Sequence, residues 1–364
     1  MRKKLGFSRI LKCFALVLFS AFLFNSSYAS GESEGKFNAG EMIIHHVSDA
    51  HEIHIIGDFA IYLPVIIYDN GLKVFSSSHF YHNSKEIEVA GKHEHYYEHD
   101  GYILYHEKVY LAPNGIELNE DGSAITNEAA FDLSITKSVA GLLLVLIIMT
   151  FIFIQVAKVY KRREGMAPKG FQTLIEQLIL FIRDDVVRPS IGHKADKFLP
   201  FLLTVFFFIW ISNMLGLIPF IGGFNITGTI SVTMVLAALV FIITTIKGNK
   251  HYWMHILWPP GVPFLVKLIL IPVEIMSVFI KPFVLMVRLT ANITAGHIII
   301  LAFVSLIFIF GESGAGAGYG AGVFSTIFMM FMNVIELLVA FLQAYVFTLL
   351  AALYFGAAVE EAHH

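Results

Sequence analysis

The chain has 364 residues, of which 56% are hydrophobic and 15% are charged, and its mean hydropathy is +0.70. This composition is too apolar for an ordinary soluble globular protein and predicts an integral membrane protein. The formal net charge is -3, and no cluster of lysines and arginines alternates with aromatic residues, so nucleic acid is not an expected partner.

Cofactor-dependent chemistry is not predicted. The only cysteine, Cys13, leaves no pair for a disulfide and no thiolate cluster for a metal. The sequence contains neither a Walker A loop nor a GxGxxG turn after a strand. We therefore expect no cofactor and no catalytic residue of the chain's own, and nucleotide chemistry would belong to a partner.

Residues 1–29 have the layout of a secretory signal peptide. Basic residues lie between Arg2 and Lys12, the apolar run CFALVLFSAFLF follows, and small residues end the segment at Ala29. The alternative is a short N-terminal membrane anchor, but twelve apolar residues are too few to cross a bilayer. We expect the mature N-terminus to lie outside the cytoplasm.

Residues 30–131 are predicted to form a small β-rich extracytoplasmic module. Short alternating runs such as HEIHII and GYILYHEKVYL are separated by Asn-Gly turn signals at residues 70–71 and 114–115. Ten of the sixteen histidines fall in this range, but their spacing matches no zinc signature. Histidines on solvated strands explain this composition better, and we predict no metal site.

Residues 132–364 are predicted to form the membrane domain. The first apolar run, residues 138–157, is long enough to span a bilayer, and five basic residues follow it up to Lys169. The positive-inside rule puts that end in the cytoplasm, in agreement with an exported N-terminus. Residues 171–187 are amphipathic and are expected to lie along the cytoplasmic surface, the alternative being a packed helix that touches no lipid.

Four further membrane segments are expected, at residues 198–220, 229–246, 263–310 and 323–356. The third of these has 48 residues, and as a helix it would be about 70 Å long against a bilayer core of about 30 Å. It must be tilted, kinked at Pro272 or Pro282, or divided. The glycine-rich stretch 311–322 is expected to be a flexible outer loop.

The expected fold class is an all-α polytopic membrane protein with five membrane helices, the last two long and tilted, plus the β-rich module. We expect the C-terminus in the cytoplasm and the protein in a bacterial inner membrane.

Arg288 is the main candidate for a functional residue. It lies in an otherwise apolar helix, where an arginine costs at least about 2.5 kcal/mol and cannot deprotonate to escape. At 100° per residue, Asn292 follows it one turn later on the same face, and Lys281 and Glu274 precede it by seven and fourteen residues. One polar stripe therefore crosses the helix.

Three more polar residues fall at consistent depths. His297 faces away from the stripe, toward the outer end of the helix. Glu336 and Gln343 share one face of the last helix, seven residues apart. If the last two helices pack antiparallel, Gln343 comes level with Arg288 and Glu336 comes level with His297. The result is two hydrophilic zones separated by a fixed positive charge, which suits proton transfer without leakage.

Structural roles are the alternative for each residue alone. Arg288 could pair with a helix acid such as Glu336, His297 and Glu336 could be a satisfied buried pair, and the amides could be packing hydrogen bonds. Lys281 and Glu274 could face the cytoplasm. The occurrence of all these polar residues at matching depths favours a proton pathway. The sequence offers no carboxylate within a turn of Arg288 on its own helix, so a partner carboxylate is expected from another subunit.

Two stretches, RLTANITAGH at 288–297 and ELLVAFLQAYVFTLLAALY at 336–354, resemble subunit a of F-type ATP synthases. The residues from 168 to 220 are also similar to that family, and the likeness extends over about 135–358. The resemblance implies the stator half of an ion path, with two long tilted helices against a rotating ring of c subunits.

The resemblance also implies roles for individual residues. Arg288 matches the arginine opposite the ring carboxylate, Gln343 matches the glutamine that faces it, and Asn292 matches the asparagine one turn beyond. His297 and Glu336 match the outer half-channel positions, in the order that is similar to mitochondrial members.

Glu274 and Lys281 match polar positions of the inner half-channel. We therefore expect a stator subunit that forms two proton half-channels to the c-ring carboxylate, couples proton flow to rotation and ATP synthesis, and is not an enzyme by itself. The implied partners are the c-ring, b-type peripheral stalk subunits, the catalytic head and the lipid bilayer.

Two alternatives stay open at this point. The first is an autonomous ion channel or antiporter in which Glu336 carries the ion, and the second is a membrane scaffold whose His-rich outer module binds metal or a partner. The choice of proton or sodium, and the role of the module, are likewise not decided by the sequence.

Overall fold

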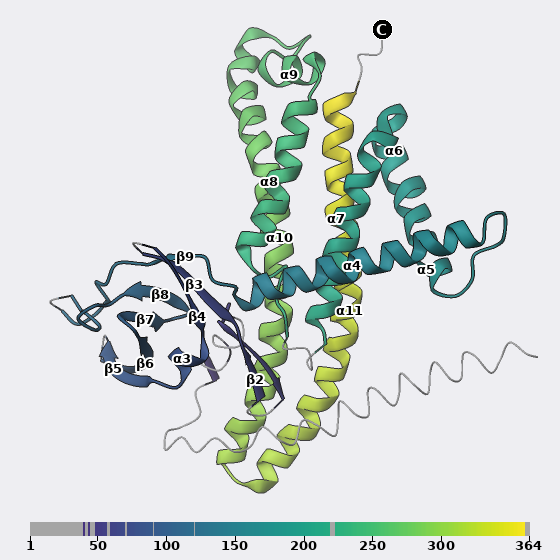
Figure 1. Cartoon of the computed structure of the whole chain (residues 1–364). Helices are drawn as coiled ribbons and strands as arrows, with labels where there is room; N and C mark the ends of the chain where they lie inside the picture. The colour runs from purple at the N-terminus through teal and green to yellow at the C-terminus, as the bar shows by residue number, and fades with distance from the viewer. Residues whose placement is uncertain are drawn as a thin grey trace, which may run out of the picture.

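The computed structural model describes residues 39–40, 43, 48–56, 59–69, 71–89, 91–119, 121–218 and 223–360. The predicted signal peptide lies outside these residues. Strands gather in one part of the molecule and long helices in the other, as Figure 1 shows. The prediction of a helical membrane domain with a β-rich N-terminal region is confirmed.

The N-terminal region contains three small antiparallel sheets with the strand orders β1-β2, β4-β3-β9 and β5-β6-β7-β8. A core that includes Val65, Ile67, Phe80, Tyr102 and Leu104 holds the second and third sheets together. The strands are β1 Glu52–Ile56, β2 Phe59–Tyr62, β3 Pro64–Tyr68, β4 Leu72–Ser76, β5 Ser84–Val89, β6 Lys92–His99, β7 Tyr102–Tyr105, β8 Lys108–Leu111 and β9 Phe131–Asp132, with a short helix α3 Ser78–Tyr81.

A buried histidine ties three parts of the module together next to the membrane domain. His51 is 1% exposed, with Nδ1 3.7 Å from Glu107 Oε2 and Nε2 3.6 Å from Asp132 Oδ2. Glu107 belongs to the turn between β7 and β8, and Asp132 ends β9. Burial opposes protonation of the imidazole, but pairing with Asp132 and Glu107 outweighs it and raises the pKa of His51 to about 9.

His51→Gln is expected to remove a pH dependence from the stability of the module. Because the folded pKa is raised from 6.5 to about 9, the stabilisation is fully present below pH 6.5 and is lost as the pH rises through 9. The free energy of unfolding should fall by up to about 3 kcal/mol over that range. Proteolytic protection of the module in the full chain measures this loss. The exposed His95→Gln variant is the control, and a flat profile for the unsubstituted protein would contradict the assignment.

Among the described residues, five helices are long and apolar enough to cross a membrane, as predicted, so the chain is a multi-pass membrane protein. The helical elements are α4 Lys137–Arg162, α5 Phe171–Phe181, a π-helical turn Ile182–Val187, α6 Arg188–Ile191, a 3-10 turn Gly192–Lys194, α7 Ala195–Gly216, α8 Ile230–Lys247, α9 Lys250–Leu257, α10 Phe264–Glu312 and α11 Ala315–Val359.

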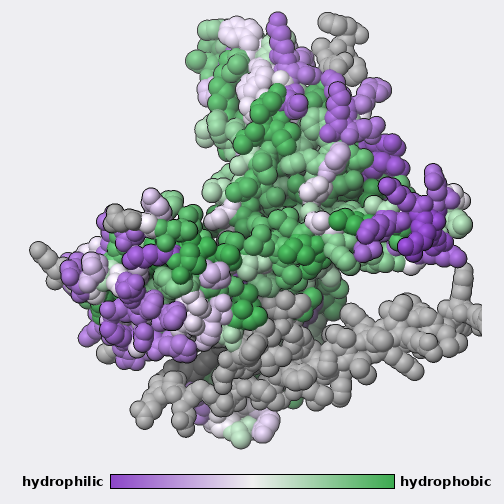
Figure 2. Space-filling view, in the orientation of Figure 1, coloured by the Kyte–Doolittle hydropathy of each residue, from purple (hydrophilic) through white to green (hydrophobic). Residues whose placement is uncertain are grey.

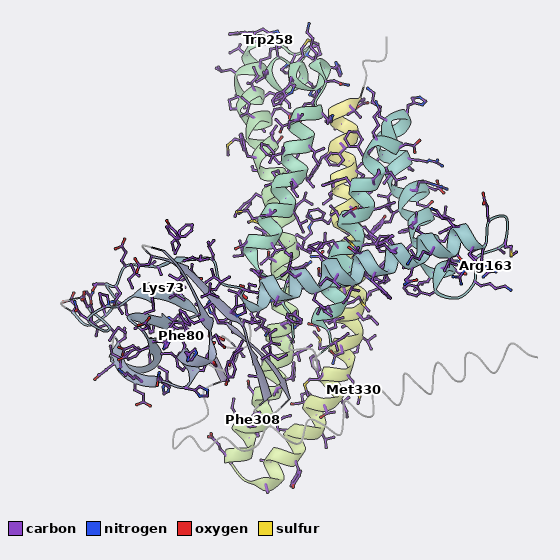
Figure 3. All side chains as sticks on the ribbon, in the orientation of Figure 1. Lys73, Phe80, Arg163, Trp258, Phe308 and Met330 are labelled. Carbon is purple, nitrogen blue, oxygen red and sulfur yellow. The ribbon has the colours of Figure 1, made fainter. Side chains whose placement is uncertain are left out.

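Helices α10 and α11 form one long antiparallel hairpin, in which α10 continues unbroken through Pro272 and Pro282. In Figure 3, Trp258 marks one end of this hairpin, and Phe308 and Met330 lie toward the other. The prediction of a flexible loop over 311–322 is wrong, because α11 already begins at Ala315. Glycines allow this tight connection, since a Cβ on Gly318 would lie 3.0 Å from the Cα of Gly311.

Helix α4 runs across the α10–α11 hairpin rather than along it (Figure 1). Its 26 residues give a length of about 39 Å, which suits a bilayer core of about 30 Å. The 49 residues of α10 give about 74 Å. Because α4 and the hairpin cross, they cannot both stand perpendicular to one bilayer. Apolar residues cover much of the helical surface in Figure 2, and hydrophilic residues gather on the module and at the Arg163 end of α4.

Aromatic packing holds α7 between its neighbours. The Phe207 ring meets Phe153 of α4 edge-on at 4.9 Å between centroids, and the Phe198 ring stacks on Phe355 of α11 at the same distance. Near the end of α11, a side chain on Gly356 would collide with the carbonyl oxygen of Ser190. These contacts fix α11 against α6 and α7. They also fix the positions of Glu336 and Gln343 along the helix bundle.

Candidate functional site

A cavity of about 300 Å³ lies where α7, the segment after it, α10 and α11 meet. His297 of α10 and Glu336 of α11 both line it, as their expected common depth required. The Glu336 carboxylate lies over Gly296, so close that a Cβ there would overlap with its Oε1 atom. Glu336 is 9% exposed. An imidazole and a carboxyl group thus line one cavity, and both kinds of group can take up and release protons.

The cavity has further polar lining that the sequence did not indicate. Asn213 of α7 donates from Nδ2 to the carbonyl oxygen of Ala340 at 3.1 Å, and its Oδ1 accepts from the Thr227 hydroxyl at 2.5 Å. Ser212 also lines the space, and its buried hydroxyl has no hydrogen-bond partner among the described residues. A free hydroxyl beside the other polar groups of this cavity is suited to binding water.

Arg288 lies outside this cavity. Asn292, one turn later on α10, does line it. The cavity therefore reaches the helical turn next to Arg288 and ends there. Gln343 is brought level with Arg288, as predicted. Its Nε2 donates to the backbone carbonyl oxygen of Arg288 at 2.7 Å. This bond pins the α10 backbone at the point from which the Arg288 side chain projects.

The Arg288 side chain points to the surface of the chain. It is exposed, and among the described residues no carboxylate lies within ion-pair distance of it. A guanidinium on a largely apolar membrane helix is costly without an anion nearby, because it cannot lose its proton and become neutral. The geometry is therefore that of a site completed from outside the chain.

On the other side of Arg288, polar groups continue toward α9. Arg288 and Tyr354 of α11 are within electrostatic reach, and the Lys281 Nζ lies 5.7 Å from the centroid of the Tyr354 ring. Burial, and then the charge of Glu274, raises the pKa of Tyr252 on α9. Glu274 and Lys281 are thus placed between Arg288 and the α9 end, where the inner zone was expected.

Tyr354 was missed although its spacing could have revealed it, because it follows Gln343 by eleven residues, about three turns on the same face. Asn213 and Thr227 were missed because they lie on other segments of the chain. The pair Ser212 and Asn213 in an otherwise apolar helix was the available signal. In the part of the chain that the structure describes, no three His, Cys, Asp or Glu residues come together as a metal site.

Comparison with known families gives two matches. Residues 140–356 match the family described as ATP synthase A chain, and this region contains α10, α11 up to Gly356 and every residue that lines the cavity. Residues 42–133 match a family described as a domain of unknown function (DUF8433), which corresponds to the β-rich module.

Individual relatives agree with the first match. The chain is 45% identical to ATP synthase subunit a 2 of Chlorobaculum tepidum over 237 residues, which is 63% of this chain and 64% of that protein. It is 36% identical to ATP synthase subunit a 2 of Prosthecochloris aestuarii over 84% of this chain and 94% of that protein. ATP synthase subunit a of Myxococcus xanthus is 37% identical over 68% of this chain and 80% of its own length.

Proposed function

The chain belongs to the ATP synthase A chain family, and from this premise we propose that it is the proton-conducting stator subunit of an F-type ATP synthase membrane sector. Protons pass through two half-channels that meet a carboxylate of the rotating c-ring. Proton flow is coupled to rotation and so to ATP synthesis. The chain performs no ATP chemistry itself.

The exposed, unpaired Arg288 carries this proposal. Among the described residues it has no ion-pair partner, yet it projects from the middle of an apolar helix. A ring carboxylate that passes this face would be favoured in its ionised form beside the guanidinium, and so would release its proton. The same charge would stop protons from moving directly between the two half-channels.

The cavity with His297 and Glu336 is the proposed outer half-channel. It ends at Asn292, next to Arg288, and its polar groups come from three helices. Glu274, Lys281 and Tyr354 are the proposed inner side. In this orientation the module and the N-terminus are extracytoplasmic and the C-terminus is cytoplasmic. A b-type peripheral stalk and the catalytic head are the further proposed partners.

Purification from native membranes in mild detergent tests the proposed function. We expect a small two-helix proteolipid with a mid-helix carboxylate, together with nucleotide-binding subunits, to copurify and to be identified by mass spectrometry. Recovery of the chain alone, with ion transport of its own in liposomes, would contradict the proposal and would favour Glu336 as the carrier of an autonomous channel or antiporter.

Gly296→Ala is expected to slow ATP-driven proton pumping roughly 10-fold to 100-fold, because the added Cβ displaces the Glu336 carboxylate. Assembly should be retained, since the displaced atom is the end of a flexible side chain. Gly311→Ala on the same helix is the matched control, because nothing lies within 4 Å of its Cβ position. Equal pumping by the two variants would show that the carboxylate position is not limiting.

A further inference from the structure

The β-rich module is joined to the first turn of α4 by two hydrogen bonds. The Lys137 amide donates to the carbonyl oxygen of Ala50 at 2.9 Å, and the Ser138 amide donates to Asp49 Oδ1 at 2.8 Å. These amides begin a helix and would otherwise have no intrahelical acceptor. A carboxylate is also the favoured charge at this end of the helix. The module therefore completes the start of α4.

Apolar contact reinforces the same junction. Ile53 of β1 and Leu63, which follows β2, belong to the same buried cluster as Val145 of α4 and many residues of α7 and α11. His51 follows Asp49 by two residues, and its partner Asp132 is five residues before α4 begins. The module is thus seated on the helical part, and its base is fixed next to α4.

The first turn of α4 is in turn bonded to the segment that forms one wall of the cavity. The Ser138 and Thr229 hydroxyl groups are 2.8 Å apart. One turn later, Gly141 allows close approach, since a Cβ there would lie 2.7 Å from the Phe224 ring and 3.0 Å from Ile226. Phe224 lines the cavity with His297 and Glu336.

The same segment reaches the helices that carry the polar residues. Thr227 donates to Asn213, which donates to the Ala340 carbonyl of α11, four residues after Glu336. Farther along α8, the Thr233 and Thr290 hydroxyl groups are 2.7 Å apart, and Thr290 lies between Arg288 and Asn292 on α10. A single wall segment, residues 223–229, therefore connects α4, α7 and α11.

We propose that the module is a clamp on the outer half-channel: through Asp49 it holds the first turn of α4 against residues 223–229 and so fixes the wall of the cavity that contains His297 and Glu336. The clamp residues are Asp49, Ser138 and Thr229. This inference rests on the proposed function, and it assigns a positioning role to the region that matches a domain of unknown function. If the clamp is loosened, residues 223–229 move away from α4, the cavity widens toward Arg288, and protons leak past it.

The test uses the complete complex in liposomes, with ATP hydrolysis and ATP-driven acidification measured on the same sample. We expect Asp49→Ala to lower the number of protons retained per ATP about fivefold, the factor that corresponds to the loss of one hydrogen bond. Thr229→Val should lower it at least as much, because the Thr229 hydroxyl bonds Ser138 and also donates to the Asn225 carbonyl oxygen at 3.0 Å. Asp49→Asn and Thr229→Ser keep a hydrogen-bonding group and should behave like the unsubstituted protein. Asp121→Ala, an exposed change in the same module, is the control.

Several results would overturn the clamp. One is an unchanged proton-to-ATP ratio in both Asp49→Ala and Thr229→Val, including the case in which only the yield of complex falls. Another is equal loss in Asp49→Asn and Asp49→Ala, which would make charge, not the hydrogen bond, decisive. If one variant does not assemble, Ser138→Ala replaces it, because it deletes only the hydroxyl group. Arg288→Lys in the same assay separates the two proposals, since normal pumping by that variant removes the proposed function itself.

Discussion

Arg288→Lys is expected to abolish ATP-driven proton pumping while the complex still assembles. Lysine keeps the charge but replaces a planar, delocalised guanidinium by a compact ammonium that is strongly hydrated. The Gln343 bond goes to the backbone carbonyl of residue 288, so the contact between α10 and α11 survives the change. Loss of a preorganised group at a site of changing charge typically costs on the order of 100-fold in rate.

The measurement is acidification of liposomes per unit of ATP hydrolysed, with the amount of assembled complex determined by mass spectrometry. Arg162→Lys, at the exposed end of α4, is the matched control for the same chemical change. Pumping by Arg288→Lys at the rate of this control would refute the role of the arginine. Failure of the complex to assemble would show instead that Arg288 is a structural residue.

Glu336→Gln is expected to slow proton pumping on the order of 100-fold, because the proposed outer half-channel loses the acid that would exchange protons with His297. Glutamine has nearly the same shape, so the packing over Gly296 and the cavity wall should be kept. The proposed separation of the half-channels by Arg288 is untouched by this change, so the number of protons pumped per ATP should stay the same. The variant should therefore pump slowly while proton movement stays coupled to ATP hydrolysis.

Pumping rates between about pH 6 and about pH 9 measure this effect in the range where imidazole and carboxyl relays exchange protons. Glu360→Gln, an exposed change just beyond the end of α11, is the control. A Glu336→Gln complex with an unchanged rate at every pH would count against the relay, and a fall in the proton-to-ATP ratio would show that the acid separates the half-channels rather than feeding one.

The membrane helices and the depth of the central residues could be predicted from local pattern. Each span is a long apolar run, and residues seven apart share a helix face wherever they occur. The antiparallel hairpin then brings Gln343 to Arg288 and Glu336 to His297 without further information. Sequence spacing was sufficient because α10 and α11 are continuous, so the register is set at the hairpin and kept along both helices.

Contacts between distant segments could not be predicted. Asp49 binds the Ser138 amide across 89 residues, and Asn213 binds the Ala340 carbonyl across 127. Nothing local to either residue distinguishes it from a solvated or packing group. The prediction of a flexible loop at the glycine-rich turn was wrong for a related reason. Glycine favours flexibility in an isolated chain, but between two long helices it permits close contact, and α11 already begins at Ala315.

Proton conduction by the chain alone, compared with conduction by the complete complex, tests the central claim most directly. Both would be reconstituted in liposomes that contain a pH-sensitive dye, and a membrane potential would be applied. The account predicts that vesicles with the chain alone stay proton-tight, because the carboxylate opposite Arg288 is missing, and that vesicles with the complex acidify when ATP is added. Conduction by the chain alone that disappears in Glu336→Gln would contradict the account and identify an autonomous carrier.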